Sequence, residues 1–264
     1  MGPATVPNAP NFMDTRMKEA TMRAVYAFAS ALLVTGCVAS LVQGIPGDGN
    51  IVKETREVAD FHEVEVQSAI QATVTLGETK SVVLEGDQNL LELITTDVTN
   101  GRLVVATKPS TAIRPTKPIT VSIVTNKLDN LDLQGAARVI VTNKVETDNF
   151  KVSAVGATNV GVKSLIAKKV FVESQGASTV VLEGKASSAE VVVTGASKAD
   201  LAAFEVANLQ ANVSGASSSN VKATQSVAGD VTGASELTVT GSPTGKSVKT
   251  SGASRVVYVS APPK

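Results

Sequence analysis

The sequence has few of the side chains from which enzyme and metal sites are usually built. Its 264 residues include one cysteine, one histidine, two tyrosines and no tryptophan. One cysteine cannot form a disulfide framework, and one cysteine with one histidine cannot complete a Cys/His metal site. The sequence also lacks a phosphate-binding P-loop and a glycine-rich dinucleotide fingerprint. We therefore expect no metal and no cofactor.

An excess of charge of either sign is also missing. Lysine and arginine together number 24, aspartate and glutamate also number 24, and aromatic residues make up 3% of the chain. A nucleic-acid-binding domain needs a basic patch and, for single strands, aromatic side chains on which bases stack. The composition therefore excludes nucleic acid as the expected partner. Small and β-branched residues dominate instead, which favours an all-β repeat protein over a disordered chain.

What the second half has in abundance is a repeated tripeptide, Gly-Ala-Ser or a close variant. Its seven copies begin about 18 to 21 residues apart, a spacing typical of stacked-coil proteins. Glycine at the start of each copy suits a corner where a Cβ would hinder the backbone conformation. The predicted corner glycines are Gly135, Gly156, Gly176, Gly195, Gly215, Gly233 and Gly252.

Apolar side chains flank each corner glycine at intervals of two residues. Around Gly156, for example, Val152 and Ala154 precede the corner, and Val160 and Val162 follow it. A period of two is typical of β-strands, and valine favours them. Because one coil cannot bury its own apolar side chains, we expect the coils to stack about 4.8 Å apart. The predicted fold is all-β, a right-handed parallel β-helix of about 20 residues per coil.

Two columns of small residues follow the corner glycines. The first is alanine in every copy, and we expect it to fill a tight inward corner. The second is mostly serine or threonine, with Ala137 as the exception. It is interpreted as a ladder of hydroxyls bonded to local backbone, or alternatively as a ligand-facing hydroxyl array. The hydroxyl column comprises Thr158, Ser178, Ser197, Ser217, Ser235 and Ser254.

The N-terminal region resembles a bacterial lipoprotein signal. A polar segment, Arg16 to Arg23, precedes a short apolar segment, Ala24 to Thr35, which ends in Val34-Thr35-Gly36-Cys37. This resemblance to a lipobox implies cleavage before Cys37, lipidation of its thiol and acylation of the new N-terminus, and so a membrane anchor. A secretory signal with a chance cysteine is the alternative. In enterobacterial sorting, a residue other than Asp after the cysteine favours the outer membrane.

The composition divides the chain into successive segments. We expect a lipoprotein signal region over residues 1–37, a flexible tether over 38–56, a β-helix domain over 57–260 and a tail over 261–264. The domain comprises a first coil with a capping insertion over 57–130 and regular coils over 131–260. In the degenerate first coil, Phe61 to Ile70, Ser68 takes the place of the corner glycine and Ala69 that of the inward alanine.

The insertion, from about Leu76 to Asn130, is predicted to cover the N-terminal end of the solenoid, because an open edge would template aggregation. It contains an Asn100-Gly101 turn signal. The predicted elements are strands over Ser81–Glu85, Arg102–Thr107 and Ile119–Thr125, and a short helix or turn within Asn89–Val98.

Several motifs in this order resemble the head GIN domain family, whose name describes auto-transporter adhesin heads. They are FHEVEVQSAI, VVLEGDQNLL, NGRLVV, LDNLDLQGAA and the serial GAS coils, and together they cover roughly Glu57 to Val259. The resemblance implies a parallel β-helix that is secreted or lipid-anchored in a bacterial envelope. The family name implies adhesion. The resemblance supplies no catalytic residues to transfer.

Acidic residues suitable for catalysis are scattered in the sequence. Asp132 and Glu173 share a predicted outward column, but Ser153 lies between them. The single histidine, His62, lies on an outward phase beside Glu63, so no Ser–His–Asp arrangement is predicted. These residues are interpreted as solvated surface groups, and no catalytic residue is expected. Three further acids fall in different columns: Asp200, Glu205 and Asp230.

The sequence therefore favours a non-catalytic, adhesin-like binding domain over an enzyme. The expected partners are a membrane, through the lipid anchor, and a surface polysaccharide or protein ligand. The expected location is the bacterial cell envelope, as an outer-membrane lipoprotein that faces either the periplasm or the outside. A structural scaffold of the envelope is the second hypothesis, and an enzyme acting on envelope polysaccharides is the third.

Overall fold

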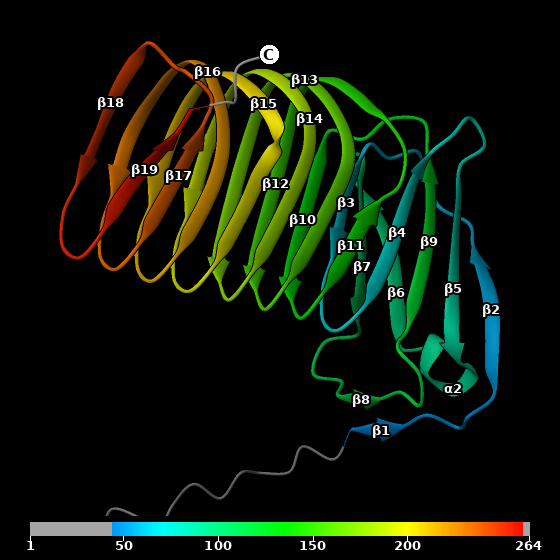
Figure 1. The fold of residues 1–264 in the computed structure, drawn as a ribbon. Coiled ribbons are helices and arrows are strands. Elements are labelled where there is room, and N and C mark those ends of the chain that lie inside the picture. The colour runs from blue at the N-terminus through cyan, green and yellow to red at the C-terminus, as the bar shows by residue number, and fades with distance from the viewer. Residues whose placement is uncertain (1–43, 261–264) are drawn as a thin grey trace, which may run out of the picture. The chain divides into compact units, whose positions relative to one another are not determined.

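The computed structural model describes residues 44–260, which belong to one compact unit (Figure 1). The predicted signal region with Cys37, residues 38–43 of the predicted tether and the tail 261–264 lie outside the described residues. The described part is a β-solenoid with an antiparallel layer at its N-terminal end. This is the parallel β-helix with a β-rich cap that the sequence predicts.

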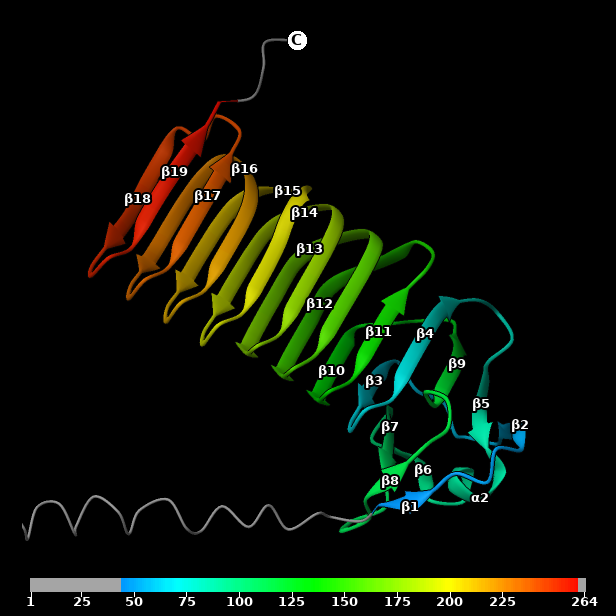
Figure 2. The same cartoon turned by 60° about the horizontal axis from the view of Figure 1, so that its bottom comes forward.

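Parallel strands build the solenoid, and each coil between the first and the last pairs with the coil before and after it (Figure 2). The repeat keeps its register, because Gly135 lies opposite Gly156 and Gly156 opposite Gly176. Small register shifts occur at the far side of the coils, where coil lengths differ. The strands are β10 (Asn130–Gly135), β11 (Arg138–Val141), β12 (Val145–Gly156), β13 (Asn159–Gly176), β14 (Thr179–Val193), β15 (Lys198–Val213), β16 (Ser218–Val231), β17 (Glu236–Thr240), β18 (Gly245–Thr250) and β19 (Arg255–Val259).

The predicted valine columns form the interior. Around the second corner, Val152, Ala154, Val160 and Val162 are all buried, and their counterparts up to Val239 are buried in the same way. Two phenylalanines of the regular coils, at positions 150 and 204, add volume to this core. Since every described coil contributes the same inward positions, the core is one continuous cluster along the solenoid.

The alanine column at the corners is not inward, so that part of the prediction is wrong. Ala157, Ala177 and their equivalents are exposed, whereas Thr158 and Ser178, one position further on, are buried. The physical reason is that strand alternation continues through the corner. Positions four and two before the glycine and positions two, four and six after it all point inward, so the intervening alanine must point outward.

The degenerate first coil has the predicted alignment. It consists of β3 (Glu63–Val66) and β4 (Gln71–Leu76), which pair in parallel with β10 and β11. Ser68 takes the place of the corner glycine with a φ of 66°, and its carbonyl accepts a hydrogen bond from the Ala136 amide at 2.9 Å. The Gly135 carbonyl accepts the equivalent bond from Ala157 at 2.7 Å. Ala69, however, is exposed like the other corner alanines.

The insertion covers the N-terminal end of the solenoid (Figure 1). Strands β7 and β9 pair in parallel with β3 and β4, and β6, β5 and β2 then pair antiparallel. The expected helix is shorter than the segment predicted to hold it, since Val98 lies in a strand. The elements are β5 (Ser81–Asp87), α2 (Gln88–Leu91), β6 (Ile94–Thr99), β7 (Arg102–Thr107), β8 (Ile113–Arg114) and β9 (Thr120–Thr125).

The C-terminal half of the predicted tether is also part of this cap. It contains β1 (Ile45–Pro46), which pairs with β8, and β2 (Ile51–Arg56), which pairs with β5. The glycines that suggested a tether lie around these strands, and Pro46 lies within β1. The buried carboxylate of Asp87 fixes the arrangement, because it accepts bonds from the Gly49 amide at 2.8 Å and from the Thr116 amide at 2.8 Å.

The two ends of the solenoid differ. At the C-terminal end, β18 pairs with β16 and β19 pairs with β17, and among residues 44–260 no strand pairs with their outer edges. The interior columns are consequently uncovered there. Tyr258 is 40% exposed, although its counterpart Val239 in the preceding coil is fully buried.

Candidate functional site

The corner glycines have backbone conformations that a side chain would strain. Their φ angles are all positive, from 75° at Gly252 to 109° at Gly156. A Cβ at Gly195 would lie 2.6 Å from the carbonyl oxygen of Gly176, and the other corners from Gly156 to Gly252 are similarly tight, whereas a Cβ at Gly135 would have its nearest contact at 3.3 Å. The corners therefore position the coils and leave no space for a ligand between them.

The hydroxyl column beside the corners is structural. Ser217 Oγ donates to the Gly195 carbonyl at 3.1 Å, and Ser235 Oγ donates to the Gly215 carbonyl at 3.2 Å. Ser178 Oγ donates to the Gln175 carbonyl at 2.8 Å. Because these hydroxyls are buried and bonded to backbone, they cannot form a ligand-facing array. The interpretation as a backbone-bonded ladder is confirmed.

The candidate catalytic residues do not come together. The His62 side chain packs on the Asn100-Gly101 turn, where a Cβ on Gly101 would lie 2.5 Å from the imidazole ring. Asp200 pairs with Lys198 at 3.3 Å. Within residues 44–260 no group of three or more His, Cys, Asp or Glu side chains could hold a metal ion.

A cluster of charges that the sequence analysis missed lies between the cap and the first two coils. Arg102 in β7 contacts Glu63 and Glu65 in β3 at 2.7 and 3.3 Å, and Asp132 in β10 at 2.9 Å. The Asn130 side chain donates to Asp132 at 2.9 Å. Asp132 and Glu65 are buried, so the prediction of a solvated surface position for Asp132 is wrong.

The surroundings shift the acid–base equilibria of this Arg102 cluster. Burial raises the pKa of Asp132, and the positive charges of Arg102 and Lys151 oppose that shift only in part. Burial acts on Glu63 in the same direction, but hydrogen bonds from Arg102 and Asn130 with nearby positive charge outweigh it, so its pKa is lowered. The hydrogen bond with Glu63 raises the pKa of Arg102. One guanidinium thus binds carboxylates from two strands.

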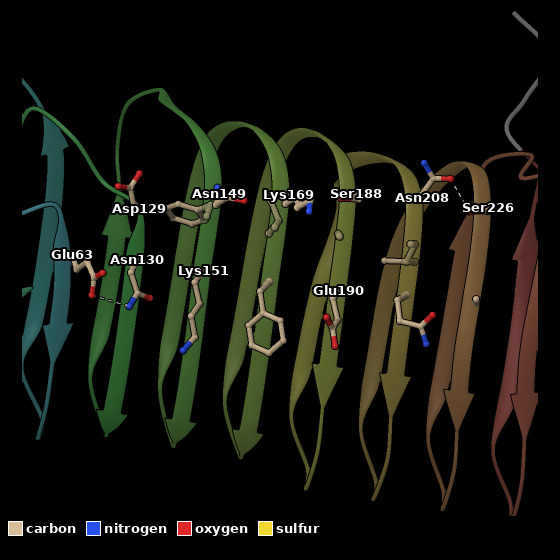
Figure 3. Close-up of a pocket in the computed structure, with 17 residues that line it drawn as sticks. Glu63, Asp129, Asn130, Asn149, Lys151, Lys169, Ser188, Glu190, Asn208 and Ser226 are labelled. Carbon is tan, nitrogen blue, oxygen red and sulfur yellow. Dashed lines mark hydrogen bonds between the residues drawn. The ribbon is translucent and has the colours of Figure 1, made fainter.

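Beside this cluster begins a groove that runs along the solenoid, across the strands β3, β10 and β12 to β16 (Figure 3). We call it the axial groove. Its volume is about 790 Å³. We call the row of buried lining residues its floor: Phe150, Val170, Ala189 and Leu209. The lining residues that precede this row in each strand form one side: Asn149, Lys169, Ser188, Asn208 and, in β16, Ser226. The lining residues that follow it, with Glu63 and Asn130 at the cap end, form the other side: Lys151, Phe171, Glu190 and Gln210.

The axial groove follows a second bend of each coil. Two consecutive outward residues mark the bend, for example Asp148 and Asn149 before the buried Phe150, or Lys168 and Lys169 before the buried Val170. The pair interrupts the strict alternation of inward and outward side chains. At this second bend the outward side chains before and after the buried residue point apart, and a depression is left between them. Recurrent pairs of this kind before an apolar residue were the sequence signal that could have located the groove.

The surface of the axial groove is mixed in chemistry. Phe171 is partly exposed, and the ammonium group of Lys151 lies 6.0 Å from the centre of its ring. Ser226 donates a hydrogen bond of 2.8 Å to the Asn208 side chain (Figure 3). Glu190 and Gln210 are exposed. The groove thus offers amides, hydroxyls, opposite charges and one aromatic face, which suits noncovalent binding.

Comparison with known proteins places the chain in a family. A family model described as "Putative auto-transporter adhesin, head GIN domain" matches residues 60–243. The chain belongs to this head GIN domain family. The resemblance noted from the sequence motifs is therefore confirmed. The matched residues include most of the cap and the solenoid from β3 to β17, and the coil of β18 and β19 lies beyond them. Among curated proteins, none matches the chain.

Solved structures share the fold of this head GIN domain. A putative adhesin from Bacteroides fragilis is 24% identical with a TM-score of 0.78, and the match covers 82% of this chain and 100% of that one. A putative lipid binding protein from Parabacteroides distasonis is 18% identical with a TM-score of 0.67 and the same two coverages. A putative adhesin from the same species is 19% identical, also with a TM-score of 0.67, over 82% of this chain and 100% of that one.

The described part of the chain contains no helix that is long and apolar enough to cross a membrane.

Proposed function

We propose that this protein is a lipid-anchored component of the bacterial cell envelope whose head GIN domain is a non-catalytic, adhesin-like binding module. The axial groove is the observation that carries the proposal. It gathers exposed side chains from successive coils into one depression, and a rigid scaffold of this kind presents them without rearrangement. The family name supports adhesion. The ligand is a surface polysaccharide or a surface protein.

Saturable binding is the direct test of this module. We expect the purified full-length chain to bind an envelope polysaccharide or a matrix protein, and we expect Lys169→Glu in the groove to weaken that binding. Lys163→Glu, at an exposed position of the same strand β13 but outside the groove, is the matched control. Absence of saturable binding to either class of partner would contradict the proposed function.

The anchor is proposed from the lipobox-like sequence that ends at Cys37. Several acyl chains on one residue would hold the domain stably at a membrane, whereas one chain binds only marginally. Radiolabelled palmitate should be incorporated by the wild-type chain and not by Cys37→Ala. Equal labelling of the two proteins would contradict an anchor at this residue.

A scaffold role is the second candidate, and the open C-terminal end favours it. The outer edges of β18 and β19 have no paired strand among residues 44–260, and Tyr258 and Val259 are 40% and 44% exposed. Unpaired strand edges are sites of strand addition. Concentration-dependent self-association in sedimentation experiments, without ligand binding, would favour this candidate over the binding module.

An envelope glycan enzyme, the third candidate, receives no support from the Arg102 cluster. There all three carboxylates contact one guanidinium, including Glu63, the one of the three that lines the axial groove. Turnover of a glycan that an acid-to-amide substitution abolishes would restore this candidate.

A further inference from the structure

We infer that the ligand of the axial groove is a neutral, linear glycan that lies along the solenoid axis and crosses the strands. The inference rests on the proposed function and specifies its ligand class. It follows from the hydrogen bonding of the groove floor, from the charges that remain free on its sides, and from the kinds of side chain that face the groove.

The backbone hydrogen bonding of the strands under the groove disfavours an extended peptide as the ligand. Peptides that bind β-proteins usually add a strand to a free edge, where main-chain hydrogen bonds supply the affinity. The strands under the groove, β12 to β16, each pair on both sides with neighbouring coils, so the backbone there offers no free edge. A ligand in the groove must therefore be recognised by side chains alone.

The charges of the groove disfavour a polyanion. Glu63 is paired with Arg102 at 2.7 Å, and Asp129 with Lys127 at 2.6 Å. Two lysines, Lys151 and Lys169, face the groove together with Glu190. Such a small net charge does not match a nucleic acid or a highly acidic polymer, which require a continuous basic surface. It matches a ligand without net charge.

The floor of the groove disfavours an acyl chain. Phe150, Val170, Ala189 and Leu209 form it, but each is already at least 95% buried by the coil in which it lies. An acyl chain gains affinity in proportion to the apolar surface that it removes from water. Because so little of that surface is left uncovered, the floor offers little to a lipid tail.

The side chains that do face the groove suit sugar rings. Of the four described phenylalanines, three are buried in the core and Phe171 alone is partly exposed. An aromatic face on a wet surface offers stacking to the apolar face of a ring, while amides and hydroxyls can bond to its hydroxyl groups. Asn149, Asn208 and Gln210 supply the amides, and Ser188 and Ser226 supply the hydroxyls.

The length of the groove gives the inference a quantitative consequence. Seven strands contribute to it, from Glu63 in β3 to Ser226 in β16. With a strand spacing of about 4.8 Å, its six intervals span about 29 Å. Each added sugar should contact a further coil, so the affinity should increase with chain length and reach a plateau when the chain spans the groove.

The experiment is calorimetric titration of the purified full-length chain with neutral cello-, xylo-, chito- and manno-oligosaccharides of increasing length. We expect at least one series to show length-dependent affinity with a plateau. Phe171→Leu keeps an apolar side chain but removes the stacking face, and Asn208→Ala removes one amide. Each should weaken binding about tenfold or more. Asn220→Ala, on an outward position of the same solenoid but outside the groove, is the control.

The outcomes separate the two proposals. Glycan binding that is independent of Phe171 and Asn208, in variants with unchanged melting temperatures, would overturn the groove assignment and leave a binding module. Binding of matrix protein or of phospholipid vesicles, with no affinity for any of the oligosaccharides, would overturn the inference that the ligand is a glycan. Absence of binding to glycans, proteins and vesicles would overturn both the glycan and the proposed function.

Discussion

At the scale of single residues, the corner glycines lie where a methyl group has no room. At Gly215 the φ angle is 87°, and a Cβ would lie 2.5 Å from the carbonyl oxygen of Gly195. Gly215→Ala should therefore lower the free energy of unfolding by about 1–3 kcal/mol or more, through backbone strain and the loss of coil-to-coil hydrogen bonding. Urea denaturation followed by circular dichroism measures the change.

The matched control for Gly215 is Gly161 in β13. It has no positive φ, and a Cβ there would meet nothing within 4 Å. Gly161→Ala should leave stability unchanged or raise it by about 0.4–1 kcal/mol, because alanine restricts the unfolded chain. Equal destabilisation by both substitutions would show that the corner conformation is not what demands glycine.

Substitution by alanine should affect stability differently at two serines of one coil. Ser217 Oγ donates to the Gly195 carbonyl at 3.1 Å, so Ser217→Ala should cost about 1 kcal/mol. Ser219 Oγ is buried in the core without a hydrogen-bond partner, and Ala199 occupies the same column one coil earlier. Ser219→Ala should therefore be neutral or stabilise by up to about 1–2 kcal/mol. Paired thermal denaturation curves test the sign, and destabilisation by Ser219→Ala would contradict it.

At the scale of elements, the Arg102 cluster joins β7 to β3 and β10. Arg102→Met should lower the free energy of unfolding by about 1–3 kcal/mol at pH 7, because three neighbouring carboxylates lose their shared positive charge. The guanidinium side chain is 37% exposed, so water screens part of the 3–5 kcal/mol that a fully buried pair would lose, as is usual for exposed ion pairs.

The loss in free energy of unfolding caused by Arg102→Met should become smaller as the pH falls from 7 toward 4. Without the arginine, carboxylates in contact raise one another's pKa in the folded state above the unfolded value. The folded state then binds protons more tightly than the unfolded state, so stability is lost as the pH rises through the raised pKa values. Arg138→Met, at an exposed arginine of β11, is the control. A deficit that is constant over this pH range would contradict the electrostatic account.

The elements that the sequence predicts well are those that local alternation determines. The columns around each glycine, such as Val152 and Val160, repeat with a period of two and identify strands, register and core together. The same alternation would have placed Thr158 inward and Ala157 outward, had it been continued through the corner. The prediction was wrong because it treated the corner as a tight inward turn filled by alanine and did not continue the strand alternation.

The Arg102 cluster and the axial groove were not predictable in the same way. Arg102, Glu63 and Asp132 come from three segments far apart in sequence, and only the pairing of the insertion strand β7 with β3 brings them together. The groove depends on a second bend that no glycine marks. Its outward columns stand at a constant distance before each corner glycine, for example Lys169 seven residues before Gly176 and Asn208 seven before Gly215. An alignment continued that far back from the glycines would have aligned these columns, but the sequence pattern does not show that their side chains border a groove.

At the scale of the whole molecule, stability should be distributed along the solenoid according to the neighbours of each coil. A coil in a stacked protein is stabilised by its own contacts and by its interfaces with adjacent coils. Strands β13 to β15 have a coil on both sides, and the first coil has β7 and β9 of the cap on its outer side. The coil of β18 and β19 has one neighbouring coil, and its apolar Val248 and Val256 are only partly buried.

Hydrogen exchange should therefore reveal an asymmetric gradient. We expect amides of β18 and β19 to exchange first and those of β13 to β15 last, with protection factors that differ by about two orders of magnitude or more. Strands β3 and β4 should be protected nearly as well as the centre, because the antiparallel cap replaces the missing coil on their outer side. Native-state exchange followed by mass spectrometry with peptide resolution measures this order. Protection of β18 and β19 equal to that of β14 in dilute solution would show that something covers the C-terminal end, and a fall to low protection on further dilution would identify a second copy of the chain as the cover.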